Sequence, residues 1–273
     1  MTGIRRLAVA TATAICCLAL AAPAATAVVY PNSIAATGDS ITRAFNTCPF
    51  PFTDCPQNSW ATGTEAAVNS FYLRIRAVNE GITGHANNDA RSGARMSNLP
   101  EQVTRAIEQR VEFVVIEMGA NDVCTSSEET MTSVASFERE FERAIRELRE
   151  RLPAARVAVG SIPSIYTLWE ILHTNRSATE TWRRLSICQS MLRNATSLSR
   201  EDEERRLRVQ RREVEFNSAL ERVCATYANC QWDRNTGYNY RFESREVGTN
   251  DFFHPSQRGQ HSIAEIEFPL IRF

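Results

Sequence analysis

Two separated stretches of the chain carry residue types that together could activate a serine. The first is G-D-S at 38–40, and the second is D-F-F-H at 251–254. A serine hydroxyl is a weak nucleophile at neutral pH, so it needs a nearby base and a carboxylate that fixes the tautomer of that base. Ser40, His254 and Asp251 supply these three groups. The pattern predicts attack by Ser40 on a carbonyl carbon.

Two further positions could stabilise the negative charge that such an attack places on oxygen. Asn121 lies in G-A-N-D at 119–122, and Gly93 lies in A-R-S-G-A-R at 90–95. An Asn side-chain amide and a backbone N–H at a flexible glycine are both suitable hydrogen-bond donors. We expect them to form an oxyanion hole together with the backbone N–H of Ser40.

Each of these residues has an ordinary interpretation when it is taken alone. Ser40 could cap a helix, and His254 could be a surface histidine. His254, His261 and Asp251 could instead bind a metal ion that activates water. Pro255 speaks against this metal site, because it places His254 outside the helix that carries His261. We therefore expect neither a metal nor an organic cofactor.

Short apolar runs alternate with longer amphipathic segments along most of the chain. The runs predict strands at 33–37, 112–118, 156–161 and 228–232, and a weaker one at 85–89. The amphipathic segments predict helices at 64–79, 98–109, 130–151 and 201–225, and a last helix from Ser256. This alternation predicts an α/β fold, a three-layer α/β/α sandwich around a central parallel sheet.

The residues with chemical potential follow predicted strands. Ser40 comes directly after the first strand, Asn121 follows the strand at 112–118, and the stretch 251–254 lies between the last strand and the last helix. Parallel sheets of this kind bind ligands beyond the carboxyl ends of their strands. We therefore expect these side chains to meet at one edge of the sheet.

In this order, G-D-S, the turn glycine, G-A-N-D and D-F-F-H-P-S resemble the ordered blocks of the GDSL, or SGNH, hydrolase family. The resemblance covers the chain from Ile34 to about Ala264. It implies a flavodoxin-like fold with Ser40, His254 and Asp251 as a catalytic triad. It also implies that Ser40, Gly93 and Asn121 form the oxyanion hole. Ile41 stands where the family motif has Leu, which is also apolar.

The resemblance implies a hydrolase that cleaves carboxylic esters, such as lipid or acyl esters, through an acyl-enzyme. The stretches at 58–64 and 68–72 are similar to the phospholipase B-like branch of the family. The segment 164–200 is longer than a link between strands requires, and its apolar side chains could line an acyl pocket or pack on the domain. Two alternatives stay open, a carbohydrate O-acetyl esterase of the same fold and a secreted binding module without activity.

The first 27 residues have the pattern of an export signal. Arg5 and Arg6 precede an apolar stretch of about 16 residues, and the small residues A-T-A at 25–27 are typical of a cleavage site. We therefore expect a secreted, extracellular protein. Its mature part, 28–273, should be a single hydrolase domain with no stable membrane insertion.

Six cysteines remain in the mature part: Cys48, Cys55, Cys124, Cys188, Cys224 and Cys230. An even number in an exported chain indicates disulfides, although six cysteines allow many pairings. Proximity favours a bond between the first two and another between the last two. That leaves Cys124 to pair with Cys188.

Composition limits the kinds of partner. The chain is 43% hydrophobic and 23% charged, which is typical of a globular protein. Its 31 basic residues, all of them Arg, nearly balance 32 acidic ones. A net charge near zero favours neither nucleic acid nor an anionic membrane surface as a partner. We expect a monomer that acts on a small-molecule or lipid ester.

Overall fold

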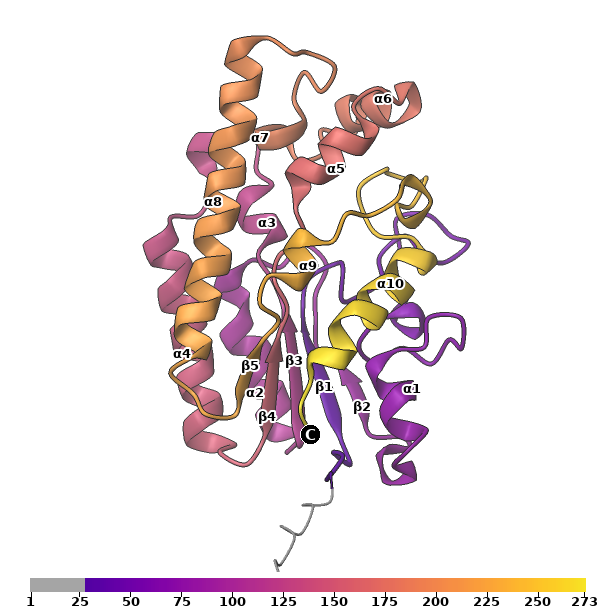
Figure 1. The fold of residues 1–273 in the computed structure, drawn as a ribbon, viewed down its shortest axis with the longest axis vertical. Coiled ribbons are helices and arrows are strands. Elements are labelled where there is room, and N and C mark those ends of the chain that lie inside the picture. The colour runs from indigo at the N-terminus through magenta and orange to yellow at the C-terminus, as the bar shows by residue number, and fades with distance from the viewer. Residues whose placement is uncertain (1–27) are drawn as a thin grey trace, which may run out of the picture.

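The structure, a computed structural model that describes residues 28–273, has a parallel sheet at its centre (Figure 1). Its strands are β1 (Ile34–Gly38), β2 (Ala86–Asn88), β3 (Phe113–Glu117), β4 (Arg156–Val159) and β5 (Cys230–Trp232). They lie in the order β2-β1-β3-β4-β5, and all neighbours are parallel. All the predicted strands are therefore present, including the weakest one.

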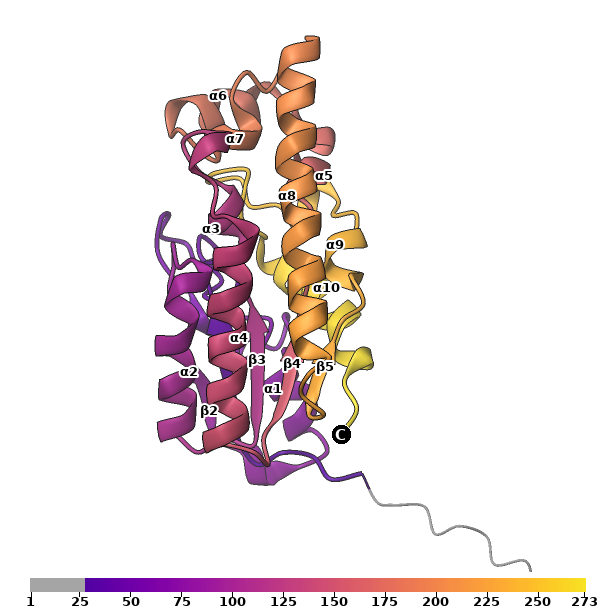
Figure 2. The ribbon, with the colours of Figure 1, turned by 90° about the vertical axis from the view of Figure 1, so that its left-hand side faces the viewer.

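Helices cover both faces of this sheet (Figures 1 and 2). One layer consists of α2 (Leu99–Glu108), α4 (Val134–Arg151) and α8 (Arg200–Cys224), and the opposite layer consists of α1 (Phe71–Arg76) and α10 (Gln257–Glu267). The predicted three-layer α/β/α sandwich is confirmed. None of the helices within residues 28–273 has the length and apolar character that a membrane span requires.

Shorter elements connect these layers. The short helices are α3 (Ala120–Val123), α5 (Ile165–Leu172), α6 (Arg176–Arg184), α7 (Gln189–Leu192) and α9 (Thr236–Asn239). Single 3-10 turns lie at Pro56–Asn58, Glu80–Ile82, Met96–Asn98, Glu128–Thr130, Ser244–Glu246 and Phe268–Leu270. Every residue of β1 and β3 is buried, because both faces of a parallel sheet pack against helices.

The helix predicted at 64–79 is wrong over its first half. The structure forms turns at 64–70, and α1 begins only at Phe71. Asn69 has a left-handed φ of 51°, which ends any regular helix before it. The Ser70 hydroxyl then accepts a hydrogen bond from the Leu73 N–H and donates one to the Gly63 carbonyl. This cap fixes the true start of the helix.

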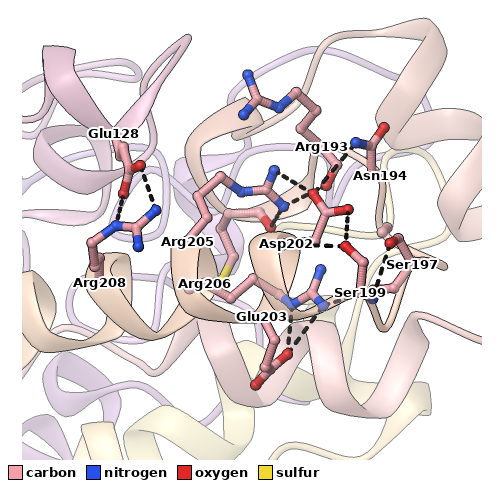
Figure 3. A network of polar contacts seen from close by, with 12 residues as sticks. Glu128, Arg193, Asn194, Ser197, Ser199, Asp202, Glu203, Arg205, Arg206 and Arg208 are labelled. Carbon is pink, nitrogen blue, oxygen red and sulfur yellow. Dashed lines mark hydrogen bonds and ion pairs between the residues drawn. The ribbon is translucent and has the colours of Figure 1, made fainter.

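The segment 164–200 forms α5, α6 and α7 beyond the carboxyl ends of the strands, where α8 extends past the sheet (Figure 1). Two buried arginines in the first turns of α8 hold it there (Figure 3). The Arg206 guanidinium stacks 4.1 Å from the centre of the Trp169 ring and donates to the Ser197 carbonyl at 2.7 Å. Arg205 donates to the Arg193 carbonyl at 2.6 Å. Much of this segment therefore packs on α8.

The cysteines lie in three pairs at disulfide distance, Cys48–Cys55, Cys124–Cys188 and Cys224–Cys230. The first and third are the pairs that proximity favours in the sequence, and the second is the pair that this choice leaves. The second pair joins the loop after α3 to the start of α7. Beside it, the Ser190 hydroxyl donates to the Val123 carbonyl at 2.6 Å.

Removal of the Cys124–Cys188 bond should destabilise the protein more than removal of either other bond. Its cysteines are 64 residues apart, against 7 and 6 for the local pairs. Loop-closure entropy in the unfolded chain then predicts a loss of about 4 kcal/mol, against about 2 kcal/mol for a local pair. Calorimetry on the three paired Cys→Ser variants measures this order. An equal fall in Tm for all three would contradict it.

A carboxyl group is buried where α8 passes α5. Glu213 has no exposed surface; its Oε1 accepts from the Ile165 N–H at 3.2 Å, and its Oε2 has no partner in the described chain. Burial raises the pKa of Glu213 well above 4.5, although the Ile165 hydrogen bond lowers it in part. The native state thus binds the carboxyl proton of Glu213 more tightly than the unfolded chain does. The resulting stabilisation is complete below the unfolded pKa and is lost as the pH rises through the folded pKa.

Glu213→Gln should therefore stabilise the protein in a pH-dependent way. The amide keeps an acceptor for the Ile165 N–H but cannot ionise. We expect a Tm close to that of the parent protein near pH 4 and higher by about 2–4 °C at pH 8, the shift typical of roughly 1 kcal/mol at this size. Thermal melts from pH 4 to 8 test this, with the exposed Glu215→Gln as control. A difference that does not change with pH would refute the interpretation.

Candidate active site

Ser40 lies in a tight turn directly after β1, at the carboxyl edge of the sheet. Gly38 has a φ of +148°, and a Cβ there would come within 2.3 Å of the Glu117 carbonyl oxygen, so only glycine fits. No helix follows at once: residues 40–46 form turns, and the Ile41 N–H is bound by Asp39 Oδ1 at 2.9 Å. Ser40 therefore does not act as a helix cap.

The structure brings Ser40, His254 and Asp251 into one hydrogen-bonded line. Ser40 Oγ lies 2.8 Å from His254 Nε2, and His254 Nδ1 lies 2.7 Å from Asp251 Oδ2. A carboxylate can only accept, so Nδ1 carries the ring proton and Nε2 is left to accept the Ser40 hydroxyl proton. The imidazole packs against the rings of Phe45 and Phe253, with centroids 4.9 and 5.2 Å away. This arrangement can move a proton from Ser40 to His254.

Asp251 is buried, yet the donors around it favour its charged form. Burial alone would raise its pKa, but hydrogen bonds and the charge of His254 outweigh this and lower the pKa below its usual value. Oδ1 accepts from the backbone N–H groups of Phe253 and His254 at 2.9 and 3.0 Å. Trp182, buried in α6, donates to the Phe252 carbonyl at 3.0 Å and so fixes the same loop.

Asn46 is a member of this site that the sequence did not suggest. Its Nδ2 donates to Asp251 Oδ2, and its Oδ1 accepts from the Phe52 N–H. Asn46 is buried in a left-handed conformation, with a φ of 66°. It lies 205 residues before Asp251. An isolated Asn in a loop gives no signal of such a contact.

The donors predicted for the oxyanion hole also face this region. Gly93 has a φ of +78°, a conformation that favours glycine. Among residues 28–273, neither the Ser40 N–H nor the Gly93 N–H donates to another protein atom, so both can donate to a ligand. Asn121 Nδ2 donates to the Ala94 carbonyl at 3.0 Å and to Asp39 Oδ2 at 3.4 Å. An oxyanion would compete with these oxygens for the amide.

Two aspartates hold the loops of the site in place. Asp39 accepts hydrogen bonds from the Ile41 N–H and the Asn121 amide. Burial raises its pKa to about 6, although these hydrogen bonds and the charge of His254 lower it. Asp122 accepts from the Met96 N–H at 2.8 Å and from the Thr132 hydroxyl at 2.7 Å. It thereby connects the loop of Gly93 to that of Asn121.

His261 does not join this group. It lies on α10, and its Nδ1 is 3.1 Å from the Val68 carbonyl oxygen. Within the described residues, no three His, Cys, Asp or Glu side chains are grouped so that they could hold a metal ion.

Two hollows meet at Ser40, His254, Asn121 and Phe253. The smaller, of about 60 Å³, is enclosed mainly by apolar side chains from α5 and the loop before His254, including Ile165, Leu168, Phe242 and Val247. The larger is an open cleft of about 430 Å³, and its lining also includes Phe45, Phe52, Gly93, Leu185 and Ile187. Only a few residues of the segment 164–200 line either hollow. Others with large apolar side chains, such as Trp169, Leu172 and Trp182, are buried in the core instead.

The sequence matches the model of the family described as GDSL-like Lipase/Acylhydrolase over residues 34–266. No curated protein matches the chain in sequence. Among solved structures, a putative GDSL-like lipase from Parabacteroides merdae is similar, with 14% identity, a TM-score of 0.53, and coverage of 87% of this chain and 94% of that one.

Two further solved structures are similar over most of their length. The esterase EstA from Pseudoalteromonas sp. has 15% identity and a TM-score of 0.49, covering 88% of this chain and 96% of that one. The extracellular lipase from Streptomyces rimosus has 16% identity and a TM-score of 0.48, covering 88% and 99%. The phospholipase B-like branch stays a prediction.

Proposed function

The chain belongs to the GDSL-like lipase/acylhydrolase family, and on that premise we propose that it is an exported serine hydrolase of carboxylic esters. The observation that carries the proposal is the line of hydrogen bonds from Ser40 through His254 to Asp251, at 2.8 and 2.7 Å. Nucleophile, base and orienting carboxylate lie within the distances that proton transfer requires.

In the proposed reaction, Ser40 Oγ attacks the ester carbonyl carbon while its proton moves to His254 Nε2. The carbonyl oxygen becomes an oxyanion, which the N–H groups of Ser40 and Gly93 and the Asn121 amide bind. The alcohol then leaves with the proton from Nε2, and an acyl group remains on Ser40. Water, deprotonated by His254, releases the acid and restores the serine.

The linings of the two hollows favour lipid or acyl esters as substrates. An alkyl chain gains from burial against Phe45, Phe52, Leu185 and Ile187, whereas a sugar ring requires several hydrogen-bonding partners. Besides Ser40, Asn121, Asp251 and His254, which have proposed roles in the reaction, Ser92 is the one polar residue among those that line the cleft in the described chain. We therefore propose that the open cleft takes a long chain of the substrate and that the enclosed hollow takes a smaller group.

We also propose that the protein is exported and that residues 28–273 act as one monomeric domain. The expected signal, 1–27, lies outside the described residues. The disulfide pairs support export, because such bonds persist in oxidising compartments.

Covalent labelling tests the proposed function directly. A p-nitrophenyl alkylphosphonate should inactivate the mature protein with one equivalent bound, and peptide mass spectrometry should locate the label on Ser40. Hydrolysis rates on p-nitrophenyl esters from acetate to palmitate, with an acetylated sugar alongside, would show the substrate class. An unlabelled, inactive protein would favour a binding module, and a preference for the acetylated sugar would favour the carbohydrate esterase.

Asn121→Ala should lower kcat by roughly a hundredfold to a thousandfold and leave KM nearly unchanged, because an oxyanion donor acts in the transition state. Steady-state kinetics on a soluble ester measure both constants. Asn229→Ala is a control for general loss of an Asn side chain, because its amide donates to the Pro153 carbonyl at 2.9 Å just before β5, away from the site. A rise in KM alone would instead make Asn121 a residue that binds the ground-state substrate.

A further inference from the structure

Exposed apolar side chains border the cleft that opens onto Ser40. Phe50 and Phe52 are 76% and 53% exposed, and Leu185 is 39% exposed. Phe52 and Leu185, from two separate segments of the chain, line the cleft, and Phe50 lies two residues from Phe52 in the same loop. We call these three residues the apolar rim. Single exposed apolar residues are common on proteins, but a group of them at the mouth of one cleft indicates a binding surface.

Both sides of the apolar rim are held in place. The loop of Phe50 and Phe52 is closed by the Cys48–Cys55 bond and projects at the right of Figure 1, below α6. Within it, the Thr53 hydroxyl donates to the Phe50 carbonyl at 2.7 Å. Leu185 is the C-cap residue that follows α6, three residues before Cys188 and its bond to Cys124. The rim therefore stays exposed without collapsing onto the protein.

Arginines surround the apolar rim. Arg183 and Arg184 are exposed directly before Leu185, and in the described chain neither has an ion-pair partner within 4 Å. Arg91 and Arg95 are exposed on either side of Gly93, which lines the same cleft. Of the acids near these arginines, Asp54 is bound by Arg43 at 3.0 Å and by the Ser92 hydroxyl at 2.5 Å, and Glu101 lies 3.9 Å from Arg91 and also pairs with Arg105. Arg95, Arg183 and Arg184 thus present positive charge that no ion pair within the described chain neutralises, although the whole chain has a formal net charge of −1.

We propose that the apolar rim and these arginines bind the surface of an anionic lipid aggregate, so that the cleft of Ser40 opens toward the lipid. Aromatic side chains suit the boundary between lipid head groups and acyl chains, and arginines bind the negative head groups. The contact is peripheral and needs no membrane-spanning segment. The inference rests on the proposed function only for the fate of the bound lipid.

Binding can be measured without hydrolysis by using the Ser40→Ala protein. In vesicle sedimentation, we expect binding about tenfold or more tighter with phosphatidylglycerol in phosphatidylcholine vesicles than with phosphatidylcholine alone. Phe50→Ser should weaken binding to the phosphatidylglycerol vesicles about fivefold or more. A double variant with Arg183→Gln and Arg184→Gln should weaken it by a similar factor.

Matched controls change the same residue classes far from the cleft. Val78→Ser alters an apolar residue that is 61% exposed between α1 and β2. The pair Arg146→Gln and Arg149→Gln removes two exposed charges from the last turns of α4. Neither control should change binding by more than about twofold. Equal losses in rim and control variants, or no preference for phosphatidylglycerol, would overturn the proposal.

An activity measurement with the serine intact completes the test. Phe50→Ser should slow hydrolysis of phosphatidylglycerol in vesicles about fivefold and leave hydrolysis of p-nitrophenyl acetate within about twofold of the parent rate. A parent protein that cleaves neither substrate would refute the proposed function but not the binding result. A parent protein that forms dimers, which Phe50→Ser converts to monomers, would show that the rim binds a second copy instead.

Discussion

Ser40→Ala is expected to fold as the parent protein does and to lose roughly three or more orders of magnitude in kcat on any soluble ester, because no acyl-enzyme can form. The Ser40 hydroxyl donates to His254 Nε2 and caps no helix, so its removal leaves the turn after β1 intact. Initial rates on p-nitrophenyl butyrate, with Tm as the measure of folding, test this expectation.

Ser92→Ala serves as the matched control, because Ser92 lines the same cleft and its hydroxyl bonds, among residues 28–273, only to Asp54. It should keep most of the activity. If Ser40→Ala retained near-parental rates with a normal Tm, hydrolysis would have to proceed without a serine nucleophile, and the proposed mechanism would be wrong.

Asp251→Asn should lower kcat by roughly a thousandfold to ten-thousandfold, the loss seen when a triad carboxylate becomes an amide. Four N–H donors converge on the carboxylate, from His254 Nδ1, Asn46 Nδ2 and the backbone of Phe253 and His254. An amide offers only one acceptor oxygen, so it cannot serve all four. His254 can then adopt the tautomer in which Nε2 no longer accepts the serine proton.

Kinetics of Asp251→Asn beside Asp54→Asn separate this effect from general loss of charge. Asp54 binds Arg43 and Ser92 but neither His254 nor Asp251. A small effect of Asp251→Asn on kcat would mean that other contacts, such as the packing of Phe45 and Phe253, are enough to orient the imidazole.

The strands and their parallel arrangement could be predicted because buried parallel strands are short apolar runs, and residues after them share one edge. Helix starts were less predictable. The apolar periodicity at 64–79 continues through residues whose backbone the Ser70 cap and the left-handed Asn69 divert into turns. Such local hydrogen bonds compete with helix formation, and a pattern of apolar positions does not record them.

For the candidate site, Ser40, Asn121, Gly93 and the stretch 251–254 could be found because each follows a recognisable element. Asn46 could not be found. Its contact with Asp251 depends on how a loop folds back over the sheet edge, which has no periodic signal in sequence. The same holds for the apolar rim, because the exposure of Phe50 and Phe52 depends on the surroundings of their loop.

The two hydrogen bonds of Asn46 limit how the Cys48–Cys55 loop could be redesigned or exchanged with that of a relative. The Asn46 Oδ1 accepts from the Phe52 N–H in the loop, and the Asn46 Nδ2 donates to the Asp251 carboxylate, which orients His254. A grafted loop must therefore present a backbone N–H at position 52, which excludes proline there. The side chain at position 50 carries no such constraint, so this is a position at which the proposed lipid affinity can be tuned separately from turnover of a soluble ester.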